Sequence, residues 1–245
     1  MTAEKSPTFH VGELPIYGET ILSPMDGVSD WPFRSLCRRL GSAMSYTEFV
    51  RAEAILQEKK SVFKKLTYEE SERPVVFQIY GDNPDKIVEA ALRIQHLGPD
   101  VIDLNMGCPS RSIANRGAGV GMMRTPLKIG TTFRKLTAAL DIPVTGKMRL
   151  GWDGCRTYKM VARMVEENGG ALIALHGRTR VRGALCRRFA LVKARFGAKA
   201  HGKYPGILRR GLRKPLVRQA KLGVSCRVKV PVEQGLTSHS YRVLQ

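Results

Sequence analysis

The chain has 245 residues, and its 41 lysines and arginines against 21 aspartates and glutamates give a formal net charge of +20. With 43% hydrophobic and 25% charged residues it has the composition of a globular protein with one sizeable core, which excludes collagen-like, low-complexity and disulfide-framework proteins. No run approaches the ~20 apolar residues of a membrane span, and no secretion signal opens the chain. The five cysteines include no CxxC pair. We therefore expect a cytoplasmic protein.

From residue 20 to residue 180, short apolar runs alternate with longer amphipathic segments. The apolar runs predict strands at Ile21–Ser23, Ala43–Thr47, Val75–Tyr80, Val101–Leu104, Val144–Met148 and Leu172–His176. The segments between them predict helices at Pro32–Leu40, Pro84–Leu97, Pro126–Leu140 and Thr157–Asn168. Asp30 is suited to cap the first of these helices, and Asp82 and Asn83 precede the second. Because helices connect the strands, neighbouring strands must run parallel.

Either an open doubly wound sheet or a closed (β/α)₈ barrel can be built from such units, and periodicity does not separate them. Polar residues follow the strands at Ser23–Gly27, Gln78, Asn105–Pro109, Lys147–Arg149 and His176–Arg178. A barrel collects such groups from all its strands at one end, whereas an open sheet gathers them at a single switch point. We therefore predict an α/β fold, a (β/α)₈ TIM barrel in which about six of the eight βα units are recognisable.

Five blocks, in this order, resemble the signatures of the tRNA-dihydrouridine synthase family: SPMDGVSDWPFR (23–34), VVFQIYG (75–81), VIDLNMGCPS (101–110), PVTGKMRLGW (143–152) and LHGRTR (175–180). The resemblance covers about 160 residues. It implies an FMN-binding barrel that reduces the C5–C6 bond of selected uridines in tRNA with NADPH as reductant. It also implies tRNA as the partner, and we expect the protein to be a monomer.

Cys108 is the predicted catalytic residue. An unperturbed thiol, with a pKa of about 8.5, is mostly protonated at neutral pH and can therefore donate a proton. Cys108 follows a predicted strand and lies between Gly107 and Pro109, away from core packing. By resemblance, it gives a proton to C5 of uracil while reduced flavin delivers hydride to C6.

The resemblance also assigns residues to the flavin and to the substrate. Lys147 at a strand end needs an anionic partner, which a reduced flavin would supply. Gln78 can both donate and accept hydrogen bonds, as recognition of a pyrimidine edge requires. The expected cofactor-binding set is Pro24, Met25, Asp26, Gln78, Lys147 and His176. Asn105 and Arg149 are expected to face the uracil or its neighbouring nucleotides, and no metal site is expected.

The glycine-rich segment 116–121 does not fit a Rossmann or P-loop motif, because its spacing is G-x-G-x-G and it starts well after a strand. We expect it to be a mobile loop whose glycines let it approach nucleic acid closely. Arg111, Arg116 and Arg124 are its candidate phosphate contacts.

The family pattern stops near residue 183. Residues 184–245 hold 15 lysines and arginines but one acidic residue, Glu233, and only Val224–Val232 predicts a strand there. We expect residues 1–183 to form an FMN-binding partial barrel and residues 184–245 to be an atypical basic tail. Out-of-frame translation of a G+C-rich gene is the explanation we favour for this tail, and a natural RNA-binding arm is the alternative.

Two other functions compete with a tRNA-dihydrouridine synthase. One is a catalytically inactive, truncated barrel that binds RNA through its basic tail. The other is an FMN-dependent barrel oxidoreductase that acts on a small pyrimidine, against which the block NMGCPS argues. A flavin absorbance band would favour the synthase over the inactive barrel.

Overall fold

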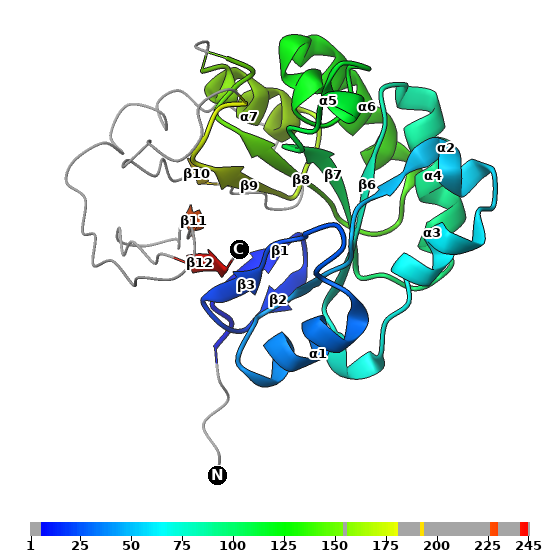
Figure 1. Cartoon of the computed structure of the whole chain (residues 1–245). Coiled ribbons are helices and arrows are strands. Elements are labelled where there is room, and N and C mark those ends of the chain that lie inside the picture. The colour runs from blue at the N-terminus through cyan, green and yellow to red at the C-terminus, as the bar shows by residue number, and fades with distance from the viewer. Residues whose placement is uncertain (1–5, 154–155, 181–191, 194–225, 230–240, 245) are drawn as a thin grey trace.

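The computed structural model describes residues 6–153, 156–180, 192–193, 226–229 and 241–244. Its main sheet has six strands, all parallel, that curl around a common centre (Figure 1). They are β4 Ser45–Tyr46, β5 Val50–Arg51, β6 Val75–Tyr80, β7 Val101–Met106, β8 Val144–Arg149 and β9 Leu172–His176. A seventh strand, β3 Thr20–Leu22, lies next to β4, where Thr20 bridges to Ser42 in parallel. The predicted β/α barrel class is confirmed, and the described sheet forms part of such a barrel.

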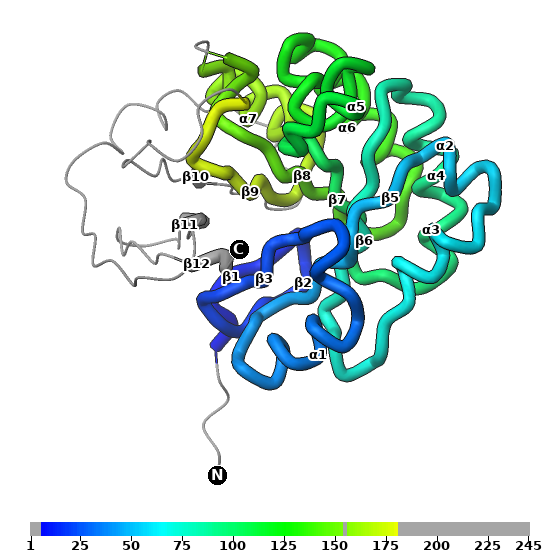
Figure 2. Tube along the Cα trace, in the orientation of Figure 1, coloured from blue at the N-terminus to red at the C-terminus, as the bar shows by residue number. Residues whose placement is uncertain are grey.

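Helices connect the parallel strands and lie on the outside of the sheet (Figure 2). The helices are α1 Trp31–Arg39, α2 Ala52–Leu56, α3 Lys60–Lys65, α4 Pro84–Gln95, α5 Arg111–Ala114, α6 Pro126–Ala139 and α7 Tyr158–Glu167, with 3-10 helices η1 Glu70–Glu72 and η2 Gly119–Arg124. All four predicted helices and all six predicted strands are present. The short elements β5, α2, α3, α5, η1 and η2 were not predicted, because each is too short to show a period.

The predicted caps explain where two of the long helices begin. The Asp30 carboxylate accepts a hydrogen bond from the Phe33 amide at 3.1 Å, and the Asn83 side chain accepts from the Asp85 and Lys86 amides. Each bond satisfies an amide that has no partner within its helix. Proline in the first turn of both helices removes another unpaired donor.

The two faces of the sheet bury different kinds of residue. Phe77, Leu104, Met148 and Leu175 point outward and pack under the helices in the larger hydrophobic cluster. Because side chains alternate along a strand, the residues between them point into the barrel. Apolar side chains fill the interior near the amino ends of the strands, and polar side chains fill it near the carboxyl ends.

A β-hairpin that the sequence did not predict covers the amino end of the barrel. It consists of β1 Phe9–Val11 and β2 Leu14–Ile16, which pair antiparallel. Its buried Phe9, Val11 and Ile16 belong to one cluster with Val76, Val101 and Leu172, which lie at the starts of three barrel strands. The hairpin thus excludes water from one end and leaves the carboxyl ends for the site.

Three short strands are described beyond residue 180, namely β10 Val192–Lys193, β11 Cys226–Lys229 and β12 Tyr241–Leu244. They form a sheet with β3 in the order β10-β11-β12-β3, and β12 runs parallel to β3. β11 lies within the predicted strand 224–232, whereas β12 was not predicted. Among the described residues no ladder joins β9 to these strands. Most of the predicted tail and its origin lie outside the described residues, so the domain boundary stays a prediction.

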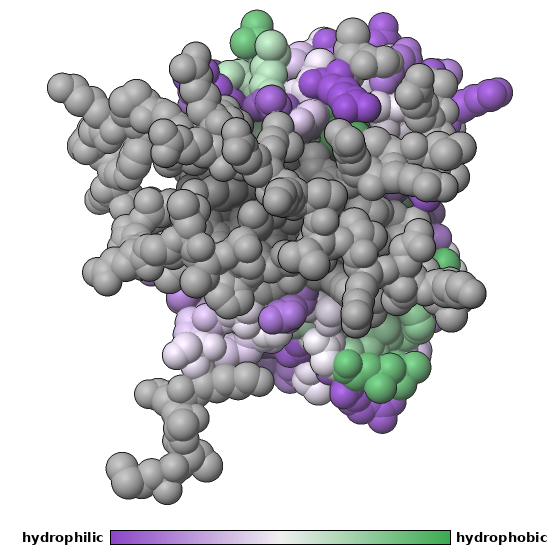
Figure 3. Space-filling model, turned by 90° about the vertical axis from the view of Figure 1, so that its left-hand side faces the viewer, coloured by the Kyte–Doolittle hydropathy of each residue, from purple (hydrophilic) through white to green (hydrophobic). Residues whose placement is uncertain are grey.

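No helix among the described residues is long and apolar enough to cross a membrane. Exposed large apolar side chains are few in this part of the chain. On the face shown in Figure 3, the hydrophobic described residues gather mainly in two small patches, near its top and at its lower right. Isolated patches of this size are usual on globular proteins.

A buried ion pair ties the first helix to the start of β6. The Arg34 guanidinium of α1 donates to the Glu72 carboxylate of η1 at 2.7 Å, and both side chains are almost completely buried. The remaining donors of Arg34 bond to the carbonyls of Ser29 (2.9 Å) and Thr67 (2.7 Å). Each nitrogen of the guanidinium therefore has a hydrogen-bond partner, and removing Glu72 would leave the Arg34 charge buried without compensation.

We predict that Glu72→Ala lowers the free energy of unfolding by about 3–5 kcal/mol, because Arg34 would remain buried and unpaired. Urea unfolding followed by circular dichroism measures this. Glu70→Ala is the control. Glu70 lies two residues from Glu72 and forms an exposed ion pair with Arg73, so its loss should leave the urea midpoint close to that of the parent. Equal midpoints for both variants would contradict the importance of the buried pair.

Candidate active site

The inward-facing polar residues of β6 to β9 form one cluster at the carboxyl ends of the strands. The sheet register places them side by side, since Gln78 lies opposite Asp103, Asn105 opposite Lys147, and Arg149 opposite His176. The predicted residues Gln78, Asn105, Lys147, Arg149 and His176 are therefore brought together from four consecutive strands. Convergence of this kind is what the carboxyl end of a barrel provides.

Cys108 is held in place through its own backbone. The Asn105 side-chain oxygen accepts hydrogen bonds from the amides of Gly107 (3.0 Å) and Cys108 (2.9 Å). The Asn105 amide nitrogen in turn donates to the Gln78 side-chain oxygen at 2.9 Å. Two residues predicted from different blocks thus fix the turn that carries the thiol.

A carboxylate that sequence reasoning missed lies beneath these residues. Asp103 is completely buried and accepts hydrogen bonds from Gln78 at 2.7 Å and from the Thr145 hydroxyl at 2.6 Å. Burial raises the pKa of Asp103 to about 6, while the bonds from Thr145 and Gln78 and the charge of Lys147 oppose the rise. The signal that could have found it is its place two residues before Asn105, since side chains two residues apart in a strand share a face.

The Cys108 thiol is protonated at neutral pH. Burial raises its pKa above the ordinary value, and the Asp26 carboxylate adds to the rise, whereas Arg149 and Lys147 oppose it. A raised pKa makes the thiolate scarce and keeps the proton on sulfur. The site therefore keeps a proton on Cys108 Sγ and is not arranged to activate a nucleophile.

His176 is neutral and lies among cations. Burial, together with the charges of Lys147, Arg149 and Arg178, lowers the pKa of its imidazole to about 3. Its Nε2 atom is buried and has no hydrogen-bond partner. A buried polar atom without a partner, next to three cationic groups, is the environment that an anionic or hydrogen-bonding ligand would complete.

Arg149 connects two of the loops at the barrel mouth. Its guanidinium donates to the carbonyl of Gly107 at 2.7 Å and to the carbonyl of Thr179 at 3.2 Å. Leu150 donates its amide to the Arg178 carbonyl, so the loops that follow β8 and β9 are joined directly as well. Arg149 therefore supports the turn that contains Cys108 in addition to contributing positive charge.

The loop after β3 lies on the other side of Cys108. Ser29 closes it, since its hydroxyl accepts from the Met25 amide at 2.9 Å and its amide donates to the Met25 carbonyl. Pro24 and Met25 are partly buried, and Asp26 is exposed and paired with Lys65. Because Asp26 influences the Cys108 thiol, the predicted first turn and the predicted proton donor border the same space.

The glycine-rich segment has a different role from the one we expected. Gly119 and Gly121 are buried in η2, and the Val120 amide donates to the Cys108 carbonyl at 3.1 Å. A Cβ atom on Gly119 would come within 2.8 Å of that carbonyl, and one on Gly121 within 2.3 Å of the Ala114 carbonyl. The expectation that these glycines approach nucleic acid is wrong, since they let η2 pack against the turn of Cys108. Arg111, Arg116 and Arg124 beside them are exposed.

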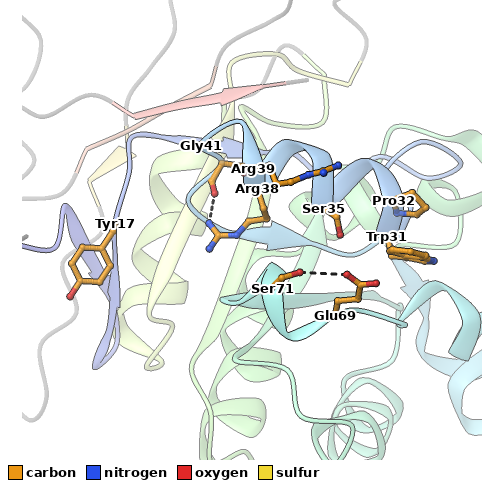
Figure 4. Close-up of a pocket in the computed structure, with 10 residues that line it drawn as sticks. Tyr17, Trp31, Pro32, Ser35, Arg38, Arg39, Gly41, Glu69 and Ser71 are labelled. Carbon is orange, nitrogen blue, oxygen red and sulfur yellow. Dashed lines mark hydrogen bonds between the residues drawn. The ribbon is translucent and has the colours of Figure 1, made fainter.

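A hollow along α1 does not coincide with this cluster. A hollow of about 660 Å³ runs along α1 and is lined by Tyr17, Trp31, Pro32, Ser35, Arg38, Arg39, Gly41, Ser42, Glu69 and Ser71 (Figure 4). Apart from α1, these residues precede strands and so lie toward the amino ends. A smaller hollow of about 210 Å³ includes Arg51, Tyr80 and Arg116 and lies at the carboxyl end, next to the segment that follows Cys108. We place the site at the carboxyl ends because the convergent polar groups are there.

No group of three or more histidine, cysteine or acidic side chains in the described part of the chain could hold a metal ion. The polar cluster combines amides, a thiol, an imidazole and cations. Its residues suit an organic ligand with hydrogen-bonding edges and negative charge.

Comparison with known proteins agrees with these features. The sequence model of the dihydrouridine synthase family matches residues 21–188. A Pseudomonas aeruginosa protein named tRNA-dihydrouridine synthase B is 38% identical over 171 residues, which are 69% of this chain and 52% of that protein. A Synechocystis protein named probable tRNA-dihydrouridine synthase 1 is 35% identical over 175 residues, 71% of this chain and 49% of that protein. The chain thus spans about half the length of the curated relatives it matches.

We predict opposite effects of two neighbouring charges on the Cys108 thiol. Arg149→Gln should raise its pKa further and slow alkylation by iodoacetamide near pH 8, whereas Asp26→Asn should lower the pKa and accelerate it. The rate is measured by mass spectrometry of the peptide that contains Cys108. Arg163→Gln, an equal charge change on the exposed face of α7, is the control and should have no effect. Shifts of the same sign in both site variants would contradict the electrostatic assignment.

We predict that His176 makes the fold less stable in acid. The unfolded imidazole titrates near pH 6.5, whereas the folded one titrates near pH 3, so the unfolded chain binds the extra proton between these values. Stability is therefore lost as the pH falls through this window. After allowance for solvent screening, the free energy of unfolding of His176→Gln, measured relative to that of the parent, should rise by ~1 kcal/mol when the pH falls from 7 to 5. Urea unfolding of both proteins measures this difference in the free energy of unfolding. A difference that does not change with pH would contradict the prediction.

Proposed function

The chain belongs to the dihydrouridine synthase family, and on that basis we propose that it reduces the C5–C6 double bond of a uridine in tRNA, with FMN as cofactor and NADPH as reductant. The observation that carries the proposal is the turn of Cys108. It holds a protonated, backbone-anchored thiol at the barrel mouth, near the cations Arg149 and Lys147. This turn and its partners lie within the segment that the family model matches.

The residues at the barrel mouth fit a flavin. The unpartnered His176 Nε2 and the cations Lys147 and Arg149 suit a ring system that carries carbonyl oxygens and gains negative charge on reduction. Gln78 keeps one N–H and one oxygen lone pair beyond its bonds to Asp103 and Asn105. With the turn Pro24–Asp26, these residues would hold the cofactor. When bound in its reduced form, FMN supplies the hydride that uracil receives at C6.

Cys108 supplies the proton in this proposal. Its raised pKa keeps hydrogen on Sγ at neutral pH until the uracil ring accepts it at C5. Asn105 and Arg149 fix the turn from both sides, by the Cys108 amide and the Gly107 carbonyl respectively. The backbone that carries the sulfur is therefore held in place, and proton transfer is efficient when donor and acceptor are held in a fixed geometry.

The substrate would have to present its base to this turn. A uridine in folded tRNA is stacked, so it must be extruded into the barrel mouth before it can react. Arg111, Arg116 and Arg124 are exposed near the turn and can contact phosphates, which would make binding dependent on salt. Because tRNA is the substrate, we place the protein in the cytoplasm.

The two competing functions receive less support. The inactive RNA-binding barrel rests on the basic tail, most of which lies outside the described residues, and the described site keeps its hydrogen-bonded partners. An oxidoreductase acting on a free pyrimidine is disfavoured because the relatives named above carry tRNA-dihydrouridine synthase in their names. The proposed boundary near residue 183 is supported by the end of the family match at residue 188.

The test is tRNA modification by a purified cysteine variant. We predict that Cys108→Ala still allows NADPH to bleach bound FMN at 450 nm but forms dihydrouridine on the order of 10²–10⁴-fold more slowly, because the proton donor is lost. Mass spectrometry of digested tRNA measures the product. Cys37→Ala, on the flank of α1, is the control and should retain activity. Equal rates in Cys108→Ala and the parent would refute the role of Cys108, and a parent protein that makes no dihydrouridine with FMN present would refute the function.

A further inference from the structure

The side chains that connect the barrel interior to Cys108 form a hydrogen-bonded chain with one direction. Asp103 accepts from the Gln78 amide nitrogen, Gln78 accepts from the Asn105 amide nitrogen, and Asn105 accepts from the Cys108 backbone amide. Asp103 and Gln78 are completely buried and Asn105 almost completely. Every link therefore lies away from bulk water, where an unpaired or reversed group is costly.

Both ends of the chain require this direction. At the upper end, the backbone amides of Gly107 and Cys108 can only donate, so Asn105 must present its oxygen to them. Its nitrogen then faces Gln78, which must present its oxygen, and the Gln78 nitrogen is left facing Asp103. A side chain at residue 103 must therefore accept a hydrogen bond at this point.

Residue 103 also accepts a hydrogen bond on its other oxygen. The Thr145 hydroxyl donates to Asp103 Oδ1 at 2.6 Å. Only an ionised carboxylate accepts on both oxygens, since an amide of the same shape has one oxygen and one nitrogen. The Lys147 charge near the carboxylate favours this ionised form.

We propose that Asp103 is a positioning residue whose carboxylate orients the Gln78 and Asn105 amides and, through them, holds the turn of Cys108. Its orientation also decides which atoms of Gln78 and Asn105 remain for a ligand. That last consequence rests on the proposed function, whereas the effect on the turn does not.

The isosteric variant Asp103→Asn tests the direction of the chain. The introduced asparagine must turn its nitrogen toward Thr145 or toward Gln78. Toward Gln78, it would reverse both amides and set the Asn105 nitrogen against the Cys108 amide. We expect hydrogen exchange of the peptide containing Gly107 and Cys108 to accelerate at least threefold, and Cys108 to be alkylated at least threefold faster by iodoacetamide.

A compensating substitution separates direction from shape. In the double variant Asp103→Asn/Gln78→Glu, the introduced asparagine can donate its nitrogen to the introduced glutamate, which still accepts from Asn105. The direction above residue 78 is thereby restored with the same net charge. Both readouts should return to within twofold of the parent.

Thr145→Val is the matched control, because it removes the other bond to Asp103 but leaves the path to Cys108 intact. It should lower the melting temperature without changing either readout at Cys108.

Three results would overturn the proposal: parent-like behaviour of Asp103→Asn, failure of the double variant to restore the turn, or an equal acceleration in Thr145→Val. None of these measurements uses flavin, NADPH or RNA. If the exchange and alkylation pattern is found and the parent forms no dihydrouridine, the positioning role stands and the proposed function fails.

Discussion

The need to satisfy polar side chains inside a barrel determines the arrangement of this site. Alternation along β6 to β9 turns Gln78, Asp103, Asn105 and Thr145 inward, where an unpaired polar group costs on the order of 1–3 kcal/mol. Their bonds to one another meet this cost for Gln78, Asp103, Asn105 and Thr145. The same bonds extend upward to the Cys108 backbone. Stability of the interior and geometry of the site therefore depend on one network.

Electrostatics divides the barrel mouth into two sides. On one side, burial, together with the charges of Lys147, Arg149 and Arg178, lowers the pKa of His176 to about 3 and keeps the imidazole neutral. On the other side, burial raises the pKa of Cys108, and the charge of Asp26 adds to the rise. The site thus combines an excess of positive charge with a protonated thiol, which suits a ligand that gains negative charge before it takes up a proton.

Backbone contacts from outside the sheet complete the turn of Cys108. Gly119 packs against it so closely that a side chain there would collide with the Cys108 carbonyl. On the far side of the loop after β3, the buried pair of Arg34 and Glu72 joins α1 to the segment that leads into β6. The sequence pattern linked these glycines to a mobile loop, but in the structure they allow close packing. A mobile loop and a closely packed segment have the same local glycine pattern, and only the position of η2 against the turn distinguishes the two.

The sequence alone determined the parallel β/α alternation, the helix caps at Asp30 and Asn83, and the convergence of polar residues at the strand ends, because each follows from local periodicity or chain order. It did not reveal the hairpin that closes the amino end, since its three-residue strands are too short to show a period. Nor did it reveal Asp103, whose role depends on partners 25 and 42 residues away. Such contacts arise only when strands take neighbouring places in the sheet, so the tertiary structure decided which polar groups meet and in which direction they bond.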